Sequence, residues 1–140
     1  MATKSDSRLL FRVFDANVNR SSEGLRVCEE VARMVLDDAA LTKRIQRIRH
    51  GIVRAASKAG KKALVSARDS KADVGRPALR GGQSRHKGYR ELVLANARRA
   101  EEALRVLEEF ARLTSVPSSD VFSRLRFQVY SVEQDLLKKL

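Results

Sequence analysis

One pattern of residues occurs twice in this chain, and the charged positions are repeated as well as the apolar ones. The first copy, NVNRSSEGLRVCEEVAR, begins at Asn17, and the second, NARRAEEALRVLEEFAR, begins at Asn96. Both read N-x-x-R-x-x-E-[GA]-L-R-V-x-E-E-x-A-R, with apolar residues recurring every three to four positions. That spacing is typical of an amphipathic helix. The fold therefore has to accommodate two similar helices, and the repeated charges need an explanation of their own.

Apolar periodicity along the whole chain predicts four helices. With about 100° of rotation per residue, a continuous apolar stripe runs through each of four segments. Asp6 or Ser7 is a candidate cap for the first helix, and Gly60 is a candidate end for the second. The predicted helices cover about residues 7–36, 37–60, 87–113 and 119–140.

The four segments form two hairpins, 7–60 and 87–140, joined by a connection over residues 61–86. A helix that is apolar on one side has to bury that side, and stacking two hairpins buries a continuous core. The expected fold is therefore all-α, a four-helix bundle of two duplicated helical hairpins in a single domain, 1–140. If the hairpins arose by duplication, the two helices that carry the pattern should face one another.

The composition agrees with a helical protein. Most apolar residues are aliphatic, Gly and Pro are scarce, and Trp is absent, which disfavours a β-sandwich or barrel. Cys28, the only cysteine, falls on the apolar stripe and is expected to be a buried structural thiol. No apolar run reaches the length of a membrane span, and the first residues lack the apolar core of a signal peptide. A cytoplasmic location is therefore expected.

A net charge of +12 indicates an anionic partner, such as nucleic acid, a phosphorylated small molecule or an acidic membrane surface. The excess is partly local, because no acidic residue occurs from Ala39 to Arg68. Two interpretations of this stretch stay open: an ordinary solvated helix face, and a surface that faces phosphate. Its basic residues before Arg68 are Lys43, Arg44, Arg47, Arg49, Arg54, Lys58, Lys61 and Lys62.

The connection over 61–86 has turn-forming residues, charges of both signs and no sustained period. Long connections inside compact domains are usually functional or disordered. Within it, Arg68 can grip phosphate oxygens, and Asp69 and Asp73 can hold a magnesium ion that also takes phosphate oxygens. The alternative is an ordinary turn that contains aspartates.

The repeated residues fall into an outer and an inner set. The outer set is expected to form Glu–Arg pairs at three- and four-residue spacing, a surface lattice of salt bridges. It comprises Arg26, Glu29, Glu30 and Arg33 with their copies Arg105, Glu108, Glu109 and Arg112.

The inner set lies within the apolar arc. An arginine that points into a bundle has to find an anion. Two alternatives stay open: a buried Arg–Glu pair in each helix, and a polar pocket between the helices lined by both copies. The set comprises Asn17, Arg20 and Glu23 with Asn96, Arg99 and Glu102.

Four stretches, taken in order, resemble a small all-helical family of thiamin biosynthesis. They are FDANVNRSSEGLRVCEEVAR, RIRHGI, ARDSKADVG and ANARRAEEALRVLEEFARL, spread over nearly the whole chain. Members of that family occur alone or fused in front of thiamin-phosphate synthase, and they are regarded as hydroxymethylpyrimidine-phosphate kinases. With no synthase sequence following, the resemblance implies the stand-alone form. One departure is Gln83, where the family pattern often has an acid.

The resemblance implies ATP-dependent phosphorylation of 4-amino-5-hydroxymethyl-2-methylpyrimidine phosphate to the diphosphate, with ATP and Mg²⁺ as cofactors. Such a transfer depends mainly on charge stabilisation and in-line positioning. The acceptor is already an ionised phosphate oxygen, so no general base is required. This fits a chain that is rich in arginine and has no evident base.

Residue roles follow from this resemblance as hypotheses. Arg20, Arg68 and Arg99 are the predicted catalytic residues, which bind the phosphates, and Asp69 and Asp73 hold the magnesium ion. The predicted substrate-binding residues are of two kinds: four from the inner set, which contact the aminopyrimidine, and three further residues that the resemblance matches. They are Asn17, Asn96, Glu23 and Glu102, and Asp15, Arg49 and His50.

Two alternative functions stay open. A helical bundle that binds nucleic acid explains the charge but not the paired Asn, Arg and Glu, and no recognised binding motif is present. A non-catalytic bundle that partners thiamin-phosphate synthase predicts no consumption of ATP. The sequence also leaves open whether a site lies within one chain or across a homo-oligomer.

Overall fold

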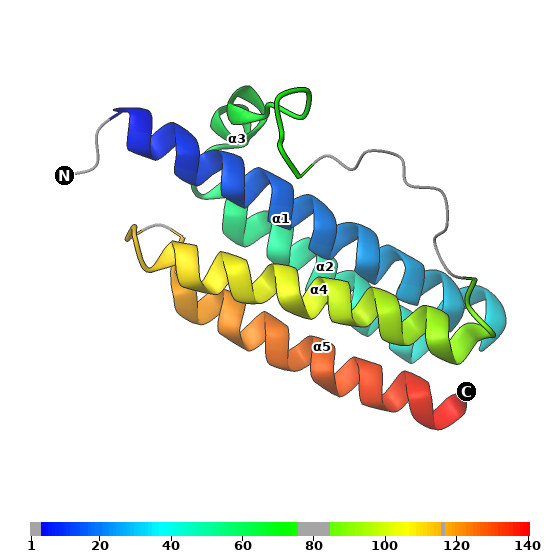
Figure 1. The fold of residues 1–140 in the computed structure, drawn as a ribbon. Coiled ribbons are helices and arrows are strands. Elements are labelled where there is room, and N and C mark those ends of the chain that lie inside the picture. The colour runs from blue at the N-terminus through cyan, green and yellow to red at the C-terminus, as the bar shows by residue number, and fades with distance from the viewer. Residues whose placement is uncertain (1–3, 76–84, 116) are drawn as a thin grey trace.

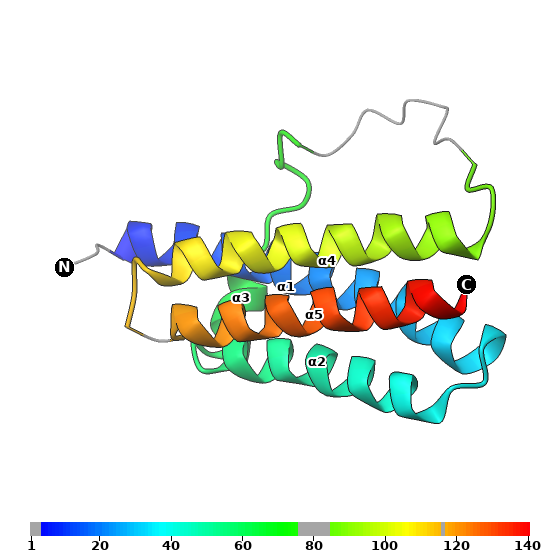
Figure 2. The same ribbon diagram turned by 90° about the horizontal axis from the view of Figure 1, so that it is seen from below.

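The computed structural model describes residues 4–75, 85–115 and 117–140, and every regular element in these residues is helical (Figure 1). Four long helices form a bundle, and a short helix lies beside the first (Figure 2). The expected all-α helical bundle is thus confirmed. Within the described residues, no helix combines the length and apolar character that crossing a bilayer requires. The elements are α1 (Lys4–Glu30), the π-helical turn η1 (Val31–Val35), α2 (Ala39–Ser57), α3 (Lys61–Ala67), α4 (Tyr89–Ala111) and α5 (Ser119–Lys139).

The two helices that carry the repeated pattern, α1 and α4, run antiparallel and pack against each other (Figures 1 and 2). They approach closely at Gly24. A Cβ added there would lie 2.5 Å from the carbonyl oxygen of Asn96 and 3.5 Å from the amide nitrogen of Ala100. Glycine therefore permits this backbone separation. The two helices face one another as expected, whereas their origin by duplication stays a prediction.

Apolar side chains from the four long helices meet in one core. The ring centroids of Phe14 on α1 and Phe122 on α5 lie 6.4 Å apart, so the first and last helices meet inside the bundle. Cys28 is buried as expected, and burial raises the pKa of its thiol to about 12, which leaves it protonated at neutral pH. Each large apolar side chain contributes about 1.5–3 kcal/mol when fully buried. Further large apolar side chains that are fully buried include Leu25, Ile45, Ile52, Leu104, Leu107 and Leu136.

The helix ends lie near the predicted positions. The Asp38 side chain caps α2 by accepting a hydrogen bond of 2.9 Å from the amide of Leu41, and Ser118 caps α5. The first helix differs from the prediction, because it already includes Lys4. Asp6 and Ser7 therefore lie inside α1 and do not cap it.

The connection over 61–86 was predicted to be irregular throughout, but it begins with the helix α3. Gly60 has a φ of 99° and separates α2 from α3. Leu64 and Ala67 are buried, and α3 packs against α1. These two apolar residues, three apart, form one buried face, but a helix of 7 residues is too short to show a sustained period in the sequence. The short helix places the residues after it beside α1.

Candidate functional site

The repeated glutamate of the first copy, Glu29, is fully buried and ties α1 to α2. Its Oε1 accepts hydrogen bonds from Arg26 at 2.9 Å and from Gln46 at 3.0 Å, and its Oε2 accepts from Arg49 at 3.0 Å. Arg49 lies on α2, so this ion pair joins the two helices of the first hairpin. Arg49 was predicted to bind substrate, and that role competes with its ion pair to Glu29.

The second hairpin contains the same arrangement. Glu108, 5% exposed, accepts hydrogen bonds from Nε of Arg126 on α5 at 3.0 Å and from Arg105 at 3.3 Å, and Nη2 of Arg126 forms an ion pair with it at 2.8 Å. The predicted surface lattice is therefore wrong for Glu29 and Glu108, because each meets an arginine from the neighbouring helix. It is right for the partly exposed pairs Arg26–Glu30 and Arg105–Glu109, each at 2.9 Å.

The inner set is not gathered into a pocket between α1 and α4. Asn17 and Asn96 are buried, and each amide donates a hydrogen bond of 2.9 Å to a carbonyl four residues earlier on its own helix. Arg20 and Arg99 are exposed, so the expectation that they point into the bundle is wrong. The close contact at Gly24 leaves no room for a guanidinium there, and long arginine side chains extend readily to solvent.

The remaining predicted residues of the inner set, Glu23 and Glu102, are also exposed. No ion pair between them and the motif arginines is seen in the described part of the chain, so the alternative of a buried Arg–Glu pair is wrong as well. His50 is exposed on α2. Gln83 lies outside the described residues.

The residues of the connection do form a site with α1. A hollow of about 150 Å³ lies between α1 and the segment that follows α3. Sequence reasoning singled out four of its residues, whereas it missed Arg12 and Asn19. The lining residues include Arg12, Asp15, Asn19, Arg68, Asp69 and Asp73.

Two of the lining residues, Arg68 and Asp15, form an ion pair. The Nε and Nη2 atoms of Arg68 donate hydrogen bonds of 2.7 and 2.8 Å to the two carboxylate oxygens of Asp15. Hydrogen bonding to Asp15, with its charge, raises the pKa of Arg68 above its ordinary value. Asp15 is 7% exposed and binds the guanidinium from the buried side. Nearly half of the Arg68 side chain stays exposed. Arg12 donates to the backbone carbonyl of Asp69 at 3.3 Å and fixes the loop against α1.

The two remaining carboxylates keep free acceptor positions. Asp69 Oδ1 accepts from the amide of Ala72 at 3.2 Å, and Asp73 Oδ1 accepts from the amide of Gly75 at 2.9 Å. Among the described residues, no group of three or more His, Cys, Asp or Glu side chains is arranged to hold a metal ion. Mg²⁺ commonly takes one or two protein carboxylates together with substrate phosphate. The pair therefore fits a magnesium ion that a phosphate ligand completes.

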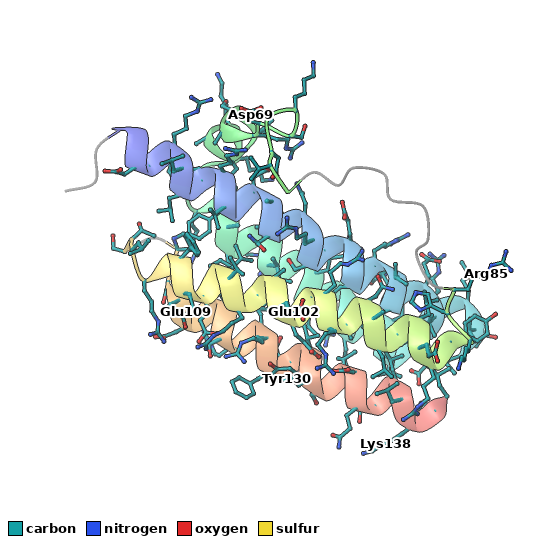
Figure 3. All side chains as sticks on the ribbon, in the orientation of Figure 1. Asp69, Arg85, Glu102, Glu109, Tyr130 and Lys138 are labelled. Atoms are coloured by element: carbon teal, nitrogen blue, oxygen red, sulfur yellow. The ribbon has the colours of Figure 1, made fainter. Side chains whose placement is uncertain are left out.

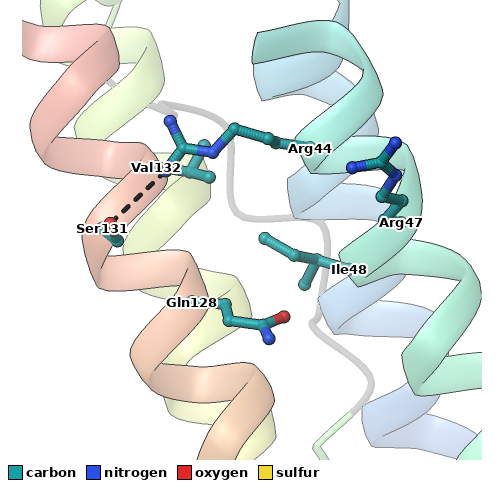
Figure 4. A pocket seen from close by; sticks show the side chains of 6 residues that line it. All are labelled: Arg44, Arg47, Ile48, Gln128, Ser131 and Val132. Atoms are coloured by element: carbon teal, nitrogen blue, oxygen red, sulfur yellow. Dashed lines mark hydrogen bonds between the residues drawn. The ribbon is translucent and has the colours of Figure 1, made fainter. Parts of the chain in front are cut away.

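A second hollow, of about 310 Å³, lies between α2 and α5 (Figure 4). Arg44 from the basic stretch pairs there with Asp135 at 2.6 Å and donates to the hydroxyl of Ser131 at 3.4 Å. Arg47 from α2 lines the same hollow. At Arg44 and Arg49, the basic stretch thus contributes ion pairs between helices, which the two interpretations from sequence did not include.

The chain is similar to proteins of thiamin biosynthesis. A family model described as the ThiD2 family matches residues 12–135. Relatives named thiamine-phosphate synthase include those of Rhodopirellula baltica, 32% identical over 99% of this chain and 37% of the relative, and Thermosynechococcus vestitus, 39% identical over 97% and 38%. A third, from Synechocystis sp., is 36% identical over 90% of this chain and 36% of the relative. No solved structure matches. The chain spans a little more than a third of the length of these relatives.

These comparisons correct the functional prediction. The relatives are named thiamine-phosphate synthase and not hydroxymethylpyrimidine-phosphate kinase, so the predicted kinase activity is contradicted. ATP was implied only by that reaction, and the matches do not support it. The connection to thiamin biosynthesis is supported.

Proposed function

This chain belongs to the ThiD2 family, and we propose that it serves thiamin biosynthesis as a helical module that binds a phosphorylated pyrimidine in the hollow around Arg68. The observation that carries the proposal is the pair formed by Arg68 and Asp15. A buried carboxylate holds one edge of an exposed guanidinium in a fixed orientation at the mouth of a hollow. Such a preorganised cation pays little entropy when it binds an anion.

The hydrogen-bonding capacity of Arg68 supports a phosphate ligand. A guanidinium has five N–H donors, and the contact with Asp15 leaves some of them free. Arg12 adds a second positive charge to the hollow. Phosphate and the carboxylates of Asp69 and Asp73 repel one another, and a shared Mg²⁺ ion removes this repulsion. Binding is therefore expected to be stronger with Mg²⁺ than without it.

The partner of this module is, on the same proposal, a thiamine-phosphate synthase. The matches include nearly all of this chain but only 37–38% of the first two relatives. The helical region therefore accompanies a longer stretch of protein in those synthases. On this proposal the chain acts together with a thiamine-phosphate synthase, and its ligand is a phosphorylated compound with the pyrimidine ring of thiamine.

Calorimetric titration tests the proposal directly. The full chain is titrated with 4-amino-5-hydroxymethyl-2-methylpyrimidine phosphate, with and without Mg²⁺, and with the free alcohol as the ligand control. The phosphate should bind and the alcohol should not. Arg68→Lys should weaken binding by about tenfold or more, because lysine does not reproduce the forked contact. Arg54→Lys, at an exposed position on α2, is the matched control and should bind like the unchanged protein. Absence of binding, or equal affinity in Arg68→Lys, would overturn the proposal.

A further inference from the structure

One face of α2 carries a row of exposed basic side chains. With about 100° of rotation per residue, five basic residues of α2 and its C-cap lie within an arc of about 80°, and the row is about 22 Å long. All five side chains are exposed. This α2 stripe comprises Lys43, Arg47, His50, Arg54 and Lys58.

The α2 stripe has no acidic partner of its own. Within the described residues, the side chains of the stripe form no hydrogen bond or ion pair. Arg44 and Arg49 lie on other sides of α2, and they pair with Asp135 and Glu29. No acidic residue occurs from Ala39 to Arg68 that could neutralise the stripe locally. Its cations are therefore available to an anion from outside the chain.

The two helices with the repeated pattern show how this chain neutralises an exposed arginine. Arg26 pairs with Glu30, and Arg105 pairs with Glu109, each at 2.9 Å and four residues apart. The same spacing in the α2 stripe places a cation beside a cation, and like charges four residues apart destabilise a helix. A bound polyanion would relieve this repulsion.

The stripe borders the hollow of about 310 Å³ between α2 and α5, because Arg47 belongs to both (Figure 4). The hollow has an apolar floor, formed by the buried residues Ile48 and Val132. Gln128 adds an amide from α5. A glutamate side chain fits this combination, since its methylene groups can cover the floor while its carboxylate reaches Arg47.

This face is separate from the candidate site at Arg68. Figure 2 shows α2 at the edge of the bundle beside α5. Figure 3 shows Asp69, which lines the hollow at Arg68, across the bundle from α5 and beside α1 and α3. The two hollows have no lining residue in common.

We propose that the α2 stripe and the adjoining hollow form a docking surface for an acidic amphipathic helix of another polypeptide. Such a helix repeats with the same period as α2, so carboxylates at the spacing of the stripe can meet all of its cations, and one glutamate can enter the hollow. Complementary charge of this kind mainly speeds association and fixes register.

Two other polyanionic partners fit this face less well. Bases of a single-stranded nucleic acid stack on aromatic side chains, and α2 contains none. A helix that lies on a membrane buries an apolar face, and no residue of the α2 stripe is apolar. Neither partner would supply a side chain for the hollow.

A designed peptide supplies the first test. The probe is a fluorescein-labelled helical peptide, rich in alanine, with glutamates at the successive four-, three-, four- and four-residue spacing of the stripe. Its controls are the peptide with glutamine in place of glutamate and one of equal composition with the glutamates adjacent. By fluorescence anisotropy the probe should bind the full chain saturably, about tenfold more tightly than either control, and more weakly as salt is added. Equal binding of the three peptides would overturn the proposal.

Variants then assign the contact to the stripe. The double variant Arg47→Gln with Arg54→Gln should bind the acidic peptide about tenfold more weakly or worse. Lys71→Gln with Arg85→Gln removes the same charge from exposed positions outside α2 and is the matched control. The stripe variant should fold, because it removes exposed, unpaired charges, and thermal melts check this. Equal affinity in the stripe variant and the control would overturn the proposal.

Charge reversal and competing anions complete the test. Arg47→Glu with Arg54→Glu should bind the peptide that has lysine in place of glutamate, and failure to do so would contradict direct pairing. A single-stranded oligonucleotide or phosphatidylglycerol vesicles that bind more tightly than the acidic peptide, and lose binding in the stripe variant, would overturn the proposal in favour of nucleic acid or membrane. Arg68→Lys should bind the acidic peptide normally, so this outcome is distinguishable from that at the phosphate site.

Discussion

The two hairpins use one glutamate in the same way but differ at positions around it. Glu29 in the first hairpin and Glu108 in the second occupy the same place in the repeated pattern. Each is buried, pairs with an arginine three residues earlier, and reaches an arginine on the following helix. The repeated charges thus stabilise each hairpin by joining its two helices.

The two hairpins differ at Asp15, which lies in the candidate ligand site, and at Glu101. Asp15, which pairs with Arg68, lies two residues before the first copy, and Leu94 lies at the same place before the second; Glu101 corresponds to Ser22 in the first copy. Glu101 is buried and hydrogen-bonded to Glu133, and it can ionise, whereas the serine at the corresponding position of the first copy cannot. We infer that the shared residues maintain the fold and that Asp15, which the second hairpin lacks, serves the candidate ligand site at Arg68.

The largest effect should come from breaking the shared ion pair. Glu29→Gln removes the charge that Arg49 and Arg26 contact, and it should lower the free energy of unfolding by about 2–4 kcal/mol. Glu30→Gln, at the partly exposed neighbour, should cost less than about 1 kcal/mol. Urea denaturation measures both. If the two variants lose equal stability, the distinction between buried and exposed repeated charges fails.

A smaller effect on stability is expected at the position that is Gly24 in the first copy and Ala103 in the second. Gly24→Ala places a methyl group 2.5 Å from a backbone oxygen of α4, so the helices have to separate, at a cost of about 1–3 kcal/mol. Ala103→Gly, the change in the opposite direction, should cost about 1 kcal/mol through backbone entropy and lost packing. Thermal or urea unfolding compares the two. A Gly24→Ala protein as stable as the original would show that α1 and α4 do not approach this closely.

A pH dependence is also expected, and it arises from Glu101 in the second hairpin. In the unfolded chain Glu101 ionises near its ordinary pKa of 4.5, and in the folded chain its pKa is about 8, chiefly because of burial and Glu133. Between these values the folded state holds a proton that the unfolded state has lost, so stability should fall as pH rises from about 4.5 to about 8. Above that range this contribution should be constant.

The control for this dependence is Glu101→Gln, which does not titrate. Subtracting its stability profile from that of the original protein, by urea denaturation at pH 5 and pH 8, isolates Glu101. A difference that stays constant between the two pH values would contradict the buried, protonated state.

The long helices were predictable because their apolar stripes persist over many turns. Their orientation was predicted less well. The helical wheel placed Arg20 inside an arc that the structure turns toward solvent, because the true arc is rotated toward the neighbouring hairpin helix. The same rotation buries Glu29 and Glu101. A single helix cannot reveal which of its polar edges a neighbour will cover, since that depends on packing between helices.

The site was predictable only in part. Arg68, Asp69 and Asp73 were identified from local composition, and the structure brings them to one hollow with Asp15. Arg12 was missed, because its role depends on where α3 places the following loop. The burial of Glu101 was also missed. It lies seven residues before Glu108, on the same edge of the helix, and an acid where the first copy has serine was the available signal.

The most direct test of the division between fold and ligand chemistry is to measure unfolding free energy and affinity for the phosphorylated pyrimidine in the same two variants, Glu29→Gln and Arg68→Lys. We expect Glu29→Gln to lose stability while the folded protein keeps its affinity. We expect Arg68→Lys to lose affinity while its stability changes by less than about 1 kcal/mol. The reverse result, with affinity lost at Glu29 and retained at Arg68, would contradict the account, because the repeated glutamate would then act on the ligand.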